Sequence, residues 1–201
     1  MMQAFHRRRP RILYVGRLVG IDLAGSARRP TGIACLEGKL VKLATVYGDE
    51  DVIKITVSPK PRLVAIDAPL TPPRRGPLRD VDRMMRRLGF PVLPPGFPGM
   101  RQLTARGMIL AAFLEEAGVR VIEIHPKSTL RALARRAGVR SAVEAARWAG
   151  LRLERPPANK HEEDAILALL TAVLYLRGEA VEVRGEEGCI VLPRWDDGRA
   201  R

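Results

Sequence analysis

Three short apolar segments of this chain each carry one acidic residue, and this pattern limits the fold more than any other feature. They are residues 18–24 (LVGIDLA) with Asp22, residues 63–68 (LVAIDA) with Asp67, and residues 119–124 (VRVIEI) with Glu123. A lone carboxylate in an apolar strand is costly to desolvate unless it is paired, protonated or bound to a cation. We therefore expect these segments to be neighbouring strands whose acids meet.

The size and composition of the chain predict a soluble globular protein. A domain has roughly 150 residues, so the 201 residues of this chain predict about one domain. Of these residues, 46% are hydrophobic. No apolar run approaches the ~20 residues of a membrane span, and the N-terminus lacks the apolar segment of a secretion signal, so we expect a cytoplasmic location and no membrane. Cys35 and Cys189 show no metal-binding spacing, and a single bridge between them stays open.

The charge balance favours a polyanionic partner. The chain carries 35 basic and 22 acidic residues, which gives a net charge of +13. Nucleic acid, either DNA or RNA, is the partner that this excess predicts. Arginine-rich composition also arises from thermophily or a GC-rich genome, so the charge alone does not decide the matter. Aromatic residues make up only 4%, which does not support a platform for stacking single strands.

The order of elements predicts an α/β domain over residues 18–201 after a basic lead-in, residues 1–17. Residues 11–15 of the lead-in either extend the first strand or are disordered. The other predicted strands are 31–37, 39–46, 63–68 and 119–124, with a C-terminal hairpin at 181–192. The predicted helices are 49–57, 79–88, 100–117, 128–138, 141–150 and 159–177, and residues 152–158 form a polar connection. Eight prolines make residues 69–99 an insertion without long regular elements.

The acids at the strand ends predict a cation site. Asp22 and Asp67 lie near the C-terminal ends of strands that we expect to be parallel neighbours, where α/β sheets place their ligand sites. Two adjacent carboxylates repel each other unless a cation such as Mg²⁺ lies between them. In the last helix, Asp164 and His161 share one face with a strip of small residues that allows a close approach to the sheet, whereas Glu162 is assigned to the helix cap.

Four motifs, taken in order, resemble an uncharacterised family of predicted nucleases with a ribonuclease H-like fold. They are GIDLAGS (20–26), AIDAPL (65–70), IEIHP (122–126) and EDAILA (163–168). The last motif is also similar to the final helix of Holliday-junction resolvases. The resemblance implies a mixed five-stranded sheet of order 3-2-1-4-5, with strand 2 antiparallel and helices on both faces. It also implies a site for two Mg²⁺ or Mn²⁺ ions built from Asp22, Asp67 and Asp164, with Glu123 as an addition.

A catalytic site of this kind would hydrolyse phosphodiester bonds. We expect His161 to transfer a proton or assist product release. Three basic residues are candidates for phosphate contacts, although each also fits a solvated surface charge. They are Arg79, Arg101 and Lys127. His125 fits a structural role as well as a functional one.

Two other functions remain open from the sequence. One is a non-catalytic module of the same fold that only binds nucleic acid. The other is an actin-like ATPase, because residues 20–26 also resemble the phosphate loop of that class, although those proteins pair two such domains. A Rossmann dinucleotide site is not indicated, since no GxGxxG motif follows a strand. The oligomeric state stays open, with a homodimer among the options.

Overall fold

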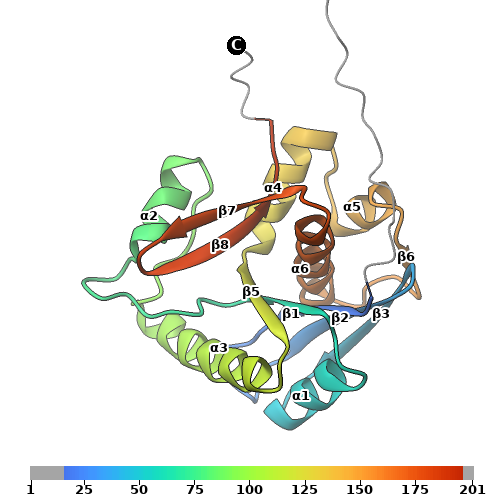
Figure 1. Cartoon of the computed structure of the whole chain (residues 1–201), viewed down its shortest axis with the longest axis horizontal. Coiled ribbons are helices and arrows are strands. Elements are labelled where there is room, and N and C mark those ends of the chain that lie inside the picture. The colour runs from blue at the N-terminus through green and yellow to red at the C-terminus, as the bar shows by residue number, and fades with distance from the viewer. Residues whose placement is uncertain (1–15, 197–201) are drawn as a thin grey trace, which may run out of the picture.

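The computed structural model describes residues 16–196, and the strands of these residues form one mixed sheet of eight (Figure 1). The strands are β1 (Leu18–Asp22), β2 (Thr31–Glu37), β3 (Leu40–Val46), β4 (Leu63–Asp67), β5 (Arg120–Ile124), β6 (Arg152–Leu153), β7 (Ala180–Gly185) and β8 (Gly188–Pro193). Their order across the sheet is β6-β3-β2-β1-β4-β5-β8-β7. The prediction for residues 11–15 lies outside the described residues.

The middle of this sheet confirms the predicted ribonuclease H-like core. Strands β3, β2, β1, β4 and β5 are consecutive neighbours, β2 is antiparallel to β1 and β3, and β1, β4 and β5 are parallel. The predicted count of five strands is too low. The C-terminal hairpin β7–β8 joins the sheet through β8, which is parallel to β5, and the predicted polar connection contains β6, which pairs with β3.

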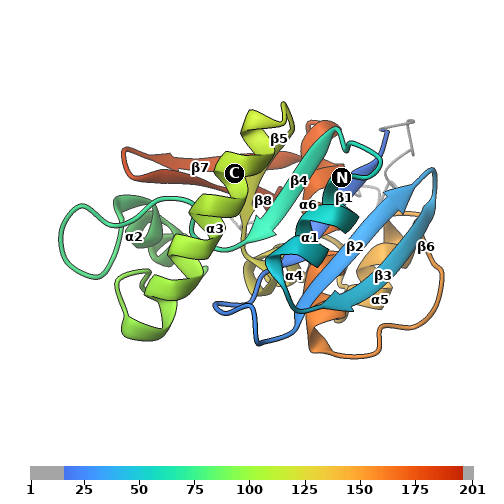
Figure 2. The ribbon, with the colours of Figure 1, turned by 90° about the horizontal axis from the view of Figure 1, so that it is seen from below.

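Helices cover both faces of the sheet, as predicted. They are α1 (Asp49–Val57), α2 (Asp80–Arg87), α3 (Pro98–Glu116), α4 (Pro126–Ala137), α5 (Ala142–Trp148) and α6 (Lys160–Leu176). Figures 1 and 2 show α4, α5 and α6 on one face and α1 and α3 on the other, with α2 beside the β7–β8 hairpin. Within residues 16–196, no helix is long and apolar enough to cross a membrane.

Two details of the sequence prediction change. Helix α4 starts at Pro126 and not at Ser128, because proline fits the first turn of a helix, where its missing N–H costs nothing. Ser128 is instead buried inside that turn. The bridge left open between Cys35 and Cys189 does not form, since both are free thiols on β2 and β8.

The pleat of the central strands decides which face each acid points to. Leu18 of β1 belongs to the core beneath α4, α5 and α6, whereas Val19 and Ile21 belong to the core beneath α1 and α3. Successive side chains of a strand point to opposite faces. Asp22, four residues after Leu18, therefore points to the α6 face. Asp67 does the same, because it stands in register with Asp22.

Candidate active site

The candidate site is centred on two aspartates that close neighbouring parallel strands. Asp22 is the last residue of β1 and Asp67 the last residue of β4, and the two are direct partners in the parallel register. Adjacent strands of a sheet lie about 4.8 Å apart, so residues in register on one face are side by side. The two carboxyl groups are close enough for each to shift the pKa of the other. The structure thus brings together the two acids that the sequence predicted to meet.

Both aspartates bind protons more tightly than ordinary carboxyl groups. Burial raises the pKa of Asp67 well above its usual range, and the negative charges of Asp22 and Asp164 raise it further. Burial also raises the pKa of Asp22, although a hydrogen bond from His161 opposes the shift. Two adjacent buried negative charges repel each other, so a cation placed between these carboxylates would be bound favourably.

The first turn of α6 supplies the other two predicted groups. The His161 Nδ1 atom lies 2.7 Å from Asp22 Oδ2, and the charge of Asp164 acts on both strand acids. Asp164 Oδ1 accepts a hydrogen bond of 2.8 Å from Lys160 Nζ, one turn earlier in the same helix. Asp22, Asp67, Asp164 and His161 therefore gather at one place.

Glu162 fixes the start of α6, as predicted, and takes no part in the acid cluster. Its backbone N–H donates to the Asn159 side chain at 3.1 Å, which caps the helix. Its own carboxylate accepts two hydrogen bonds from Arg155, at 2.7 and 2.8 Å, and others from the Ala158 N–H and the Thr45 hydroxyl. The Arg155 hydrogen bonds are the main reason that the pKa of Glu162 falls to about 2.

Two glycines let α6 lie directly against the sheet. A β-carbon on Gly20 of β1 would overlap the backbone of Ala165 and Leu169, and one on Gly32 of β2 would overlap the backbone of His161. Any larger residue at these positions would push the start of α6 away from Asp22. The small-residue strip predicted on the helix therefore has a counterpart on the sheet, which the sequence interpretation missed. A glycine inside a strand is the signal that could have revealed it.

Glu123, predicted as an additional acid of the site, lines the same pocket as Asp67 and its charge raises the pKa of Asp67, but its own carboxylate is bonded elsewhere. It stands opposite Ile66, one residue short of Asp67, so the pleat turns it toward the other face of the sheet. There it is 5% exposed and accepts hydrogen bonds from Arg79 at 2.8 and 2.5 Å and from the Leu70 N–H at 2.8 Å. Its charge is balanced inside the protein by a fixed arginine.

Arg79 cannot contact phosphate in this structure, which corrects that prediction. Its side chain is 1% exposed. Its guanidinium donates to Asp82 through Nε and Nη2, to Glu123 through both terminal nitrogens, and to the Thr71 hydroxyl through Nη1. The residue instead ties the proline-rich insertion to the end of β5.

A pocket of about 180 Å³ opens beside the aspartates. The residues that line it include the aspartates Asp67 and Asp164, the basic residues Lys127 and His125, the buried group Arg79, Asp82 and Glu123, and apolar side chains of the insertion and α3 such as Leu93 and Leu103. Lys127 is exposed, as a phosphate contact must be. Arg101, the third predicted contact, is not among the residues that line the pocket, and its Nε donates to the Gly96 carbonyl at 2.9 Å.

His125 takes a structural place at the edge of this pocket. Its Nδ1 atom lies 2.7 Å from the Ser128 hydroxyl, within the first turn of α4. Burial, together with the positive charge of Lys127, lowers the pKa of His125 to about 4. The imidazole is therefore neutral at physiological pH and offers one ring nitrogen to hydrogen bonding.

The described residues contain no preformed metal cluster, meaning no three His, Cys, Asp or Glu side chains that converge to hold an ion. Asp22 is hydrogen-bonded to His161, and Asp164 accepts a hydrogen bond from Lys160. The donors nevertheless fit Mg²⁺ or Mn²⁺ in kind, since all three are carboxylates. They also fit in charge, because two of them hold raised pKa values that a cation would lower.

Comparison with known proteins gives structural neighbours only. No family model and no curated protein match the sequence. The chain is similar to RuvC from Thermus thermophilus in complex with a Holliday junction substrate, with 19% identity, a TM-score of 0.46 and coverage of 81% of this chain and 96% of that chain. It is also similar to a second RuvC structure from Thermus thermophilus, with 20% identity, a TM-score of 0.45 and the same coverage.

Proposed function

We propose that this protein is a metal-dependent nuclease that hydrolyses phosphodiester bonds of DNA or RNA. The observation that carries the proposal is the pair of aspartates in register at the ends of β1 and β4, with Asp164 of α6 beside them. Three carboxylates at the C-terminal edge of parallel strands form an oxygen-rich site that suits divalent cations and the phosphate groups they bind. Asp22, Asp67 and Asp164 would hold Mg²⁺ or Mn²⁺.

Each residue of the cluster has a separate role in this proposal. When bound, the cations would activate water and stabilise the leaving oxygen. The hydrogen bond between His161 and Asp22 orients the imidazole. The His161 side chain is 41% exposed, so it can exchange a proton with solvent or product. Lys127, exposed in the pocket that Asp67 and Asp164 line, is placed to attract a phosphate. Lys160 would leave Asp164 when a cation replaces it.

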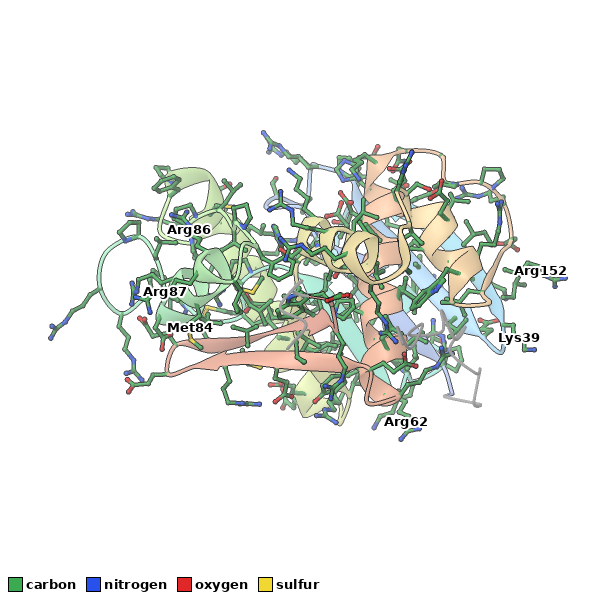
Figure 3. All side chains as sticks on the ribbon, turned by 90° about the horizontal axis from the view of Figure 1, so that it is seen from above. Lys39, Arg62, Met84, Arg86, Arg87 and Arg152 are labelled. Carbon is green, nitrogen blue, oxygen red and sulfur yellow. The ribbon has the colours of Figure 1, made fainter. Side chains whose placement is uncertain are left out.

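Nucleic acid is the substrate class that the charge of the whole chain supports. Figure 3 shows Arg86 and Arg87 on one side of the molecule and Lys39, Arg62 and Arg152 toward the other. All five are exposed, and the net charge is +13. Positive charge spread this widely favours a long polyanion over a single small phosphate ligand.

A cleavage assay tests the proposal. Labelled duplex, single-stranded and branched DNA and an RNA hairpin are incubated with the protein and either Mg²⁺, Mn²⁺ or EDTA. We expect cleavage of at least one substrate with a divalent cation, and a loss of about 100-fold or more in Asp67→Asn. Glu163→Gln, which changes an acid of the same helix turn whose side chain is 44% exposed, is the matched control and should cut like the wild type. Cleavage that survives Asp67→Asn would contradict the proposed site.

A non-catalytic nucleic-acid-binding module is the second candidate. The ion pair between Lys160 and Asp164 favours it, because a permanent cation at this position would leave the third acid unable to bind metal. In that case the protein binds nucleic acid, cuts none of the substrates, and its melting temperature does not respond to Mg²⁺ or Mn²⁺. A metal-dependent rise of the melting temperature in the wild type, absent in Asp67→Asn, would exclude this candidate.

A further inference from the structure

Lys160 places a positive charge on the third acid of the aspartate cluster. Its Nζ atom lies 2.8 Å from Asp164 Oδ1 and 3.4 Å from Glu163 Oε2. The Lys160 side chain is 59% exposed, whereas that of Asp164 is 15% exposed and lines the pocket beside the aspartates. A side chain that lies mostly in solvent is therefore bonded to a carboxylate of the candidate metal site.

The stability of α6 does not explain this contact. Lys160 is the first residue of the helix, directly after the N-cap Asn159. A positive charge is unfavourable there, because the N-terminus of a helix itself carries a partial positive charge. The pair with Asp164 also has the poorer order for residues four apart, since a helix gains more when the acid precedes the base. A lysine that served only the helix would be expected at its other end.

Lys160 competes with a divalent cation for the oxygen atoms of Asp164. Two positive charges at one carboxylate repel each other, so the presence of one disfavours the other. An exposed ion pair is closed about two to five times as often as it is open. Asp164 is then free in only about a third to a sixth of the molecules, which would weaken metal binding about three- to sixfold.

A released Lys160 stays close to the acid cluster. Its four-carbon stem is flexible, and side chains of a helix lean toward the helix N-terminus. That end of α6 lies at the edge of the sheet where β1 ends, because the His161 Nδ1 atom is 2.7 Å from Asp22 Oδ2. The free ammonium group would therefore remain at the edge where a phosphate bound to the cations must lie, and ammonium groups bind phosphate well.

We propose that Lys160 is a metal-dependent phosphate contact. It occupies Asp164 in the metal-free protein, and it binds a phosphate of the nucleic acid once a divalent cation has taken its place. This inference rests on the proposed function, because it needs a cation at Asp164 and nucleic acid as the ligand. Lys160 then couples two binding events, so metal raises the affinity for nucleic acid and nucleic acid raises the affinity for metal by the same factor.

Mn²⁺ binding to the full chain, followed by electron paramagnetic resonance of the free ion, tests the competition. Lys160→Met removes the charge and should lower the Kd for Mn²⁺ about three- to sixfold. Lys160→Arg keeps the charge and should bind Mn²⁺ no more tightly than the wild type. Lys54→Met removes an exposed charge from α1, on the other face of the sheet, and should change the Kd by less than about twofold.

The outcomes separate this inference from the proposed nuclease activity. Equal Kd values for Mn²⁺ in the wild type and Lys160→Met would overturn the competition, even if the wild type cuts nucleic acid. Mn²⁺ binding by Lys160→Met alone would support the competition and contradict metal-dependent cleavage by the wild type. The expected shift in Kd without cleavage of any substrate would contradict the nuclease proposal only. A lack of Mn²⁺ binding in both proteins would overturn both.

Fluorescence anisotropy with the labelled nucleic acid that the protein binds most tightly tests the phosphate contact. Without metal, the Kd values of the wild type and Lys160→Met should agree within about twofold, because Asp164 holds the lysine. With saturating Mn²⁺, and before measurable cleavage, Lys160→Met should bind about threefold more weakly or worse, and its slope of log Kd against log salt should be smaller by about 0.7 to 0.9. Equal Kd values with Mn²⁺ would overturn the phosphate contact, and an equal difference with and without Mn²⁺ would overturn its dependence on metal.

Discussion

Replacement of Glu162 by glutamine should destabilise the protein more than the corresponding change of carboxylate to amide at any other acid of α6. The Glu162 side chain is 2% exposed and its carboxylate accepts hydrogen bonds from Arg155, Ala158 and Thr45. The pKa of Glu162 falls from 4.5 to about 2, so the folded protein favours the ionised form by about 3 kcal/mol at most. Because Arg155 is 41% exposed and water screens its charge, we expect Glu162→Gln to lower the free energy of unfolding by about 2 kcal/mol at pH 7.

The same pKa fixes how this difference depends on pH. A carboxyl group whose pKa is lower in the folded state stabilises the protein fully above its unfolded pKa of 4.5, and this contribution disappears as the pH falls toward about 2. Urea denaturation followed by circular dichroism should therefore show the gap between wild type and Glu162→Gln narrowing from pH 7 to about pH 3. The Glu163 side chain is 44% exposed and bonded to Lys160 at 3.4 Å, so Glu163→Gln should cost less than about 0.5 kcal/mol at every pH.

Two results would refute the role given to Glu162. One is a Glu162→Gln variant that unfolds within about 0.5 kcal/mol of the wild type at pH 7, which would mean that the hydrogen bonds around this carboxylate contribute nothing net. The other is a gap that stays constant from pH 7 to about pH 3, which would mean that the lost stability comes from packing and not from the ionised carboxylate.

Three more substitutions test the site and its supports. Asp67→Asn should raise the melting temperature of the metal-free protein by about 2 to 5 °C in differential scanning fluorimetry, because it removes the repulsion from Asp22. A melting temperature of the variant below that of the wild type would contradict this repulsion. Gly32→Ala should lower the free energy of unfolding, measured by urea denaturation, by about 2 to 4 kcal/mol. Gly99→Ala, where a β-carbon would meet open space, should change it by less than about 1 kcal/mol. Equal effects of the two substitutions would contradict the close approach of α6 to the sheet. Lys127→Ala should reduce the slope of log Kd against log salt for nucleic acid by about 1, as measured by fluorescence anisotropy, and an unchanged slope would exclude a phosphate contact.

The central strands and the final helix were predictable because their sequences are nearly unambiguous. A five-residue apolar segment that ends in one acid, as in β1 and β4, favours a central strand of a sheet that is covered on both faces. The N-cap Asn159 and the apolar residues after it likewise define α6. These elements carry Asp22, Asp67 and Asp164, so the main acids of the candidate site were predicted together with the fold.

The position of Glu123 could not be predicted from its strand. A strand covered on both faces shows no alternation of polar and apolar residues, so its sequence does not reveal which side chains share a face. The register between β4 and β5 decides the matter, and it places Glu123 opposite Ile66 and not opposite Asp67. A shift of one residue sends a side chain to the other face of the sheet. The phosphate contact predicted for Arg79 is wrong for the same reason, because Arg79 forms a buried ion pair with Glu123.

The hairpin at the C-terminus illustrates a different limit. Its turn and its two strands were predicted from local sequence, but its attachment to the sheet was not. Only two residue pairs join β8 to β5, Glu123 with Ile190 and Ile124 with Val191. Contacts between segments so far apart in the chain depend on the packing of α2 and α4 against the hairpin, which no local pattern describes.

The side chains that contact the acids of this protein separate those that serve the fold from those of the proposed function. Glu123, an acid that serves the fold, is neutralised by Arg79, which is 1% exposed and bonded through every guanidinium nitrogen. The contacts of Asp22 and Asp164 are instead with His161 and Lys160, which are 41% and 59% exposed and can turn into solvent at little cost. A fold that needed a neutral aspartate pair for stability alone would gain from a fixed partner or from asparagine. Acids held together with raised pKa values and displaceable partners are better explained by a mobile cation that takes the place of Lys160.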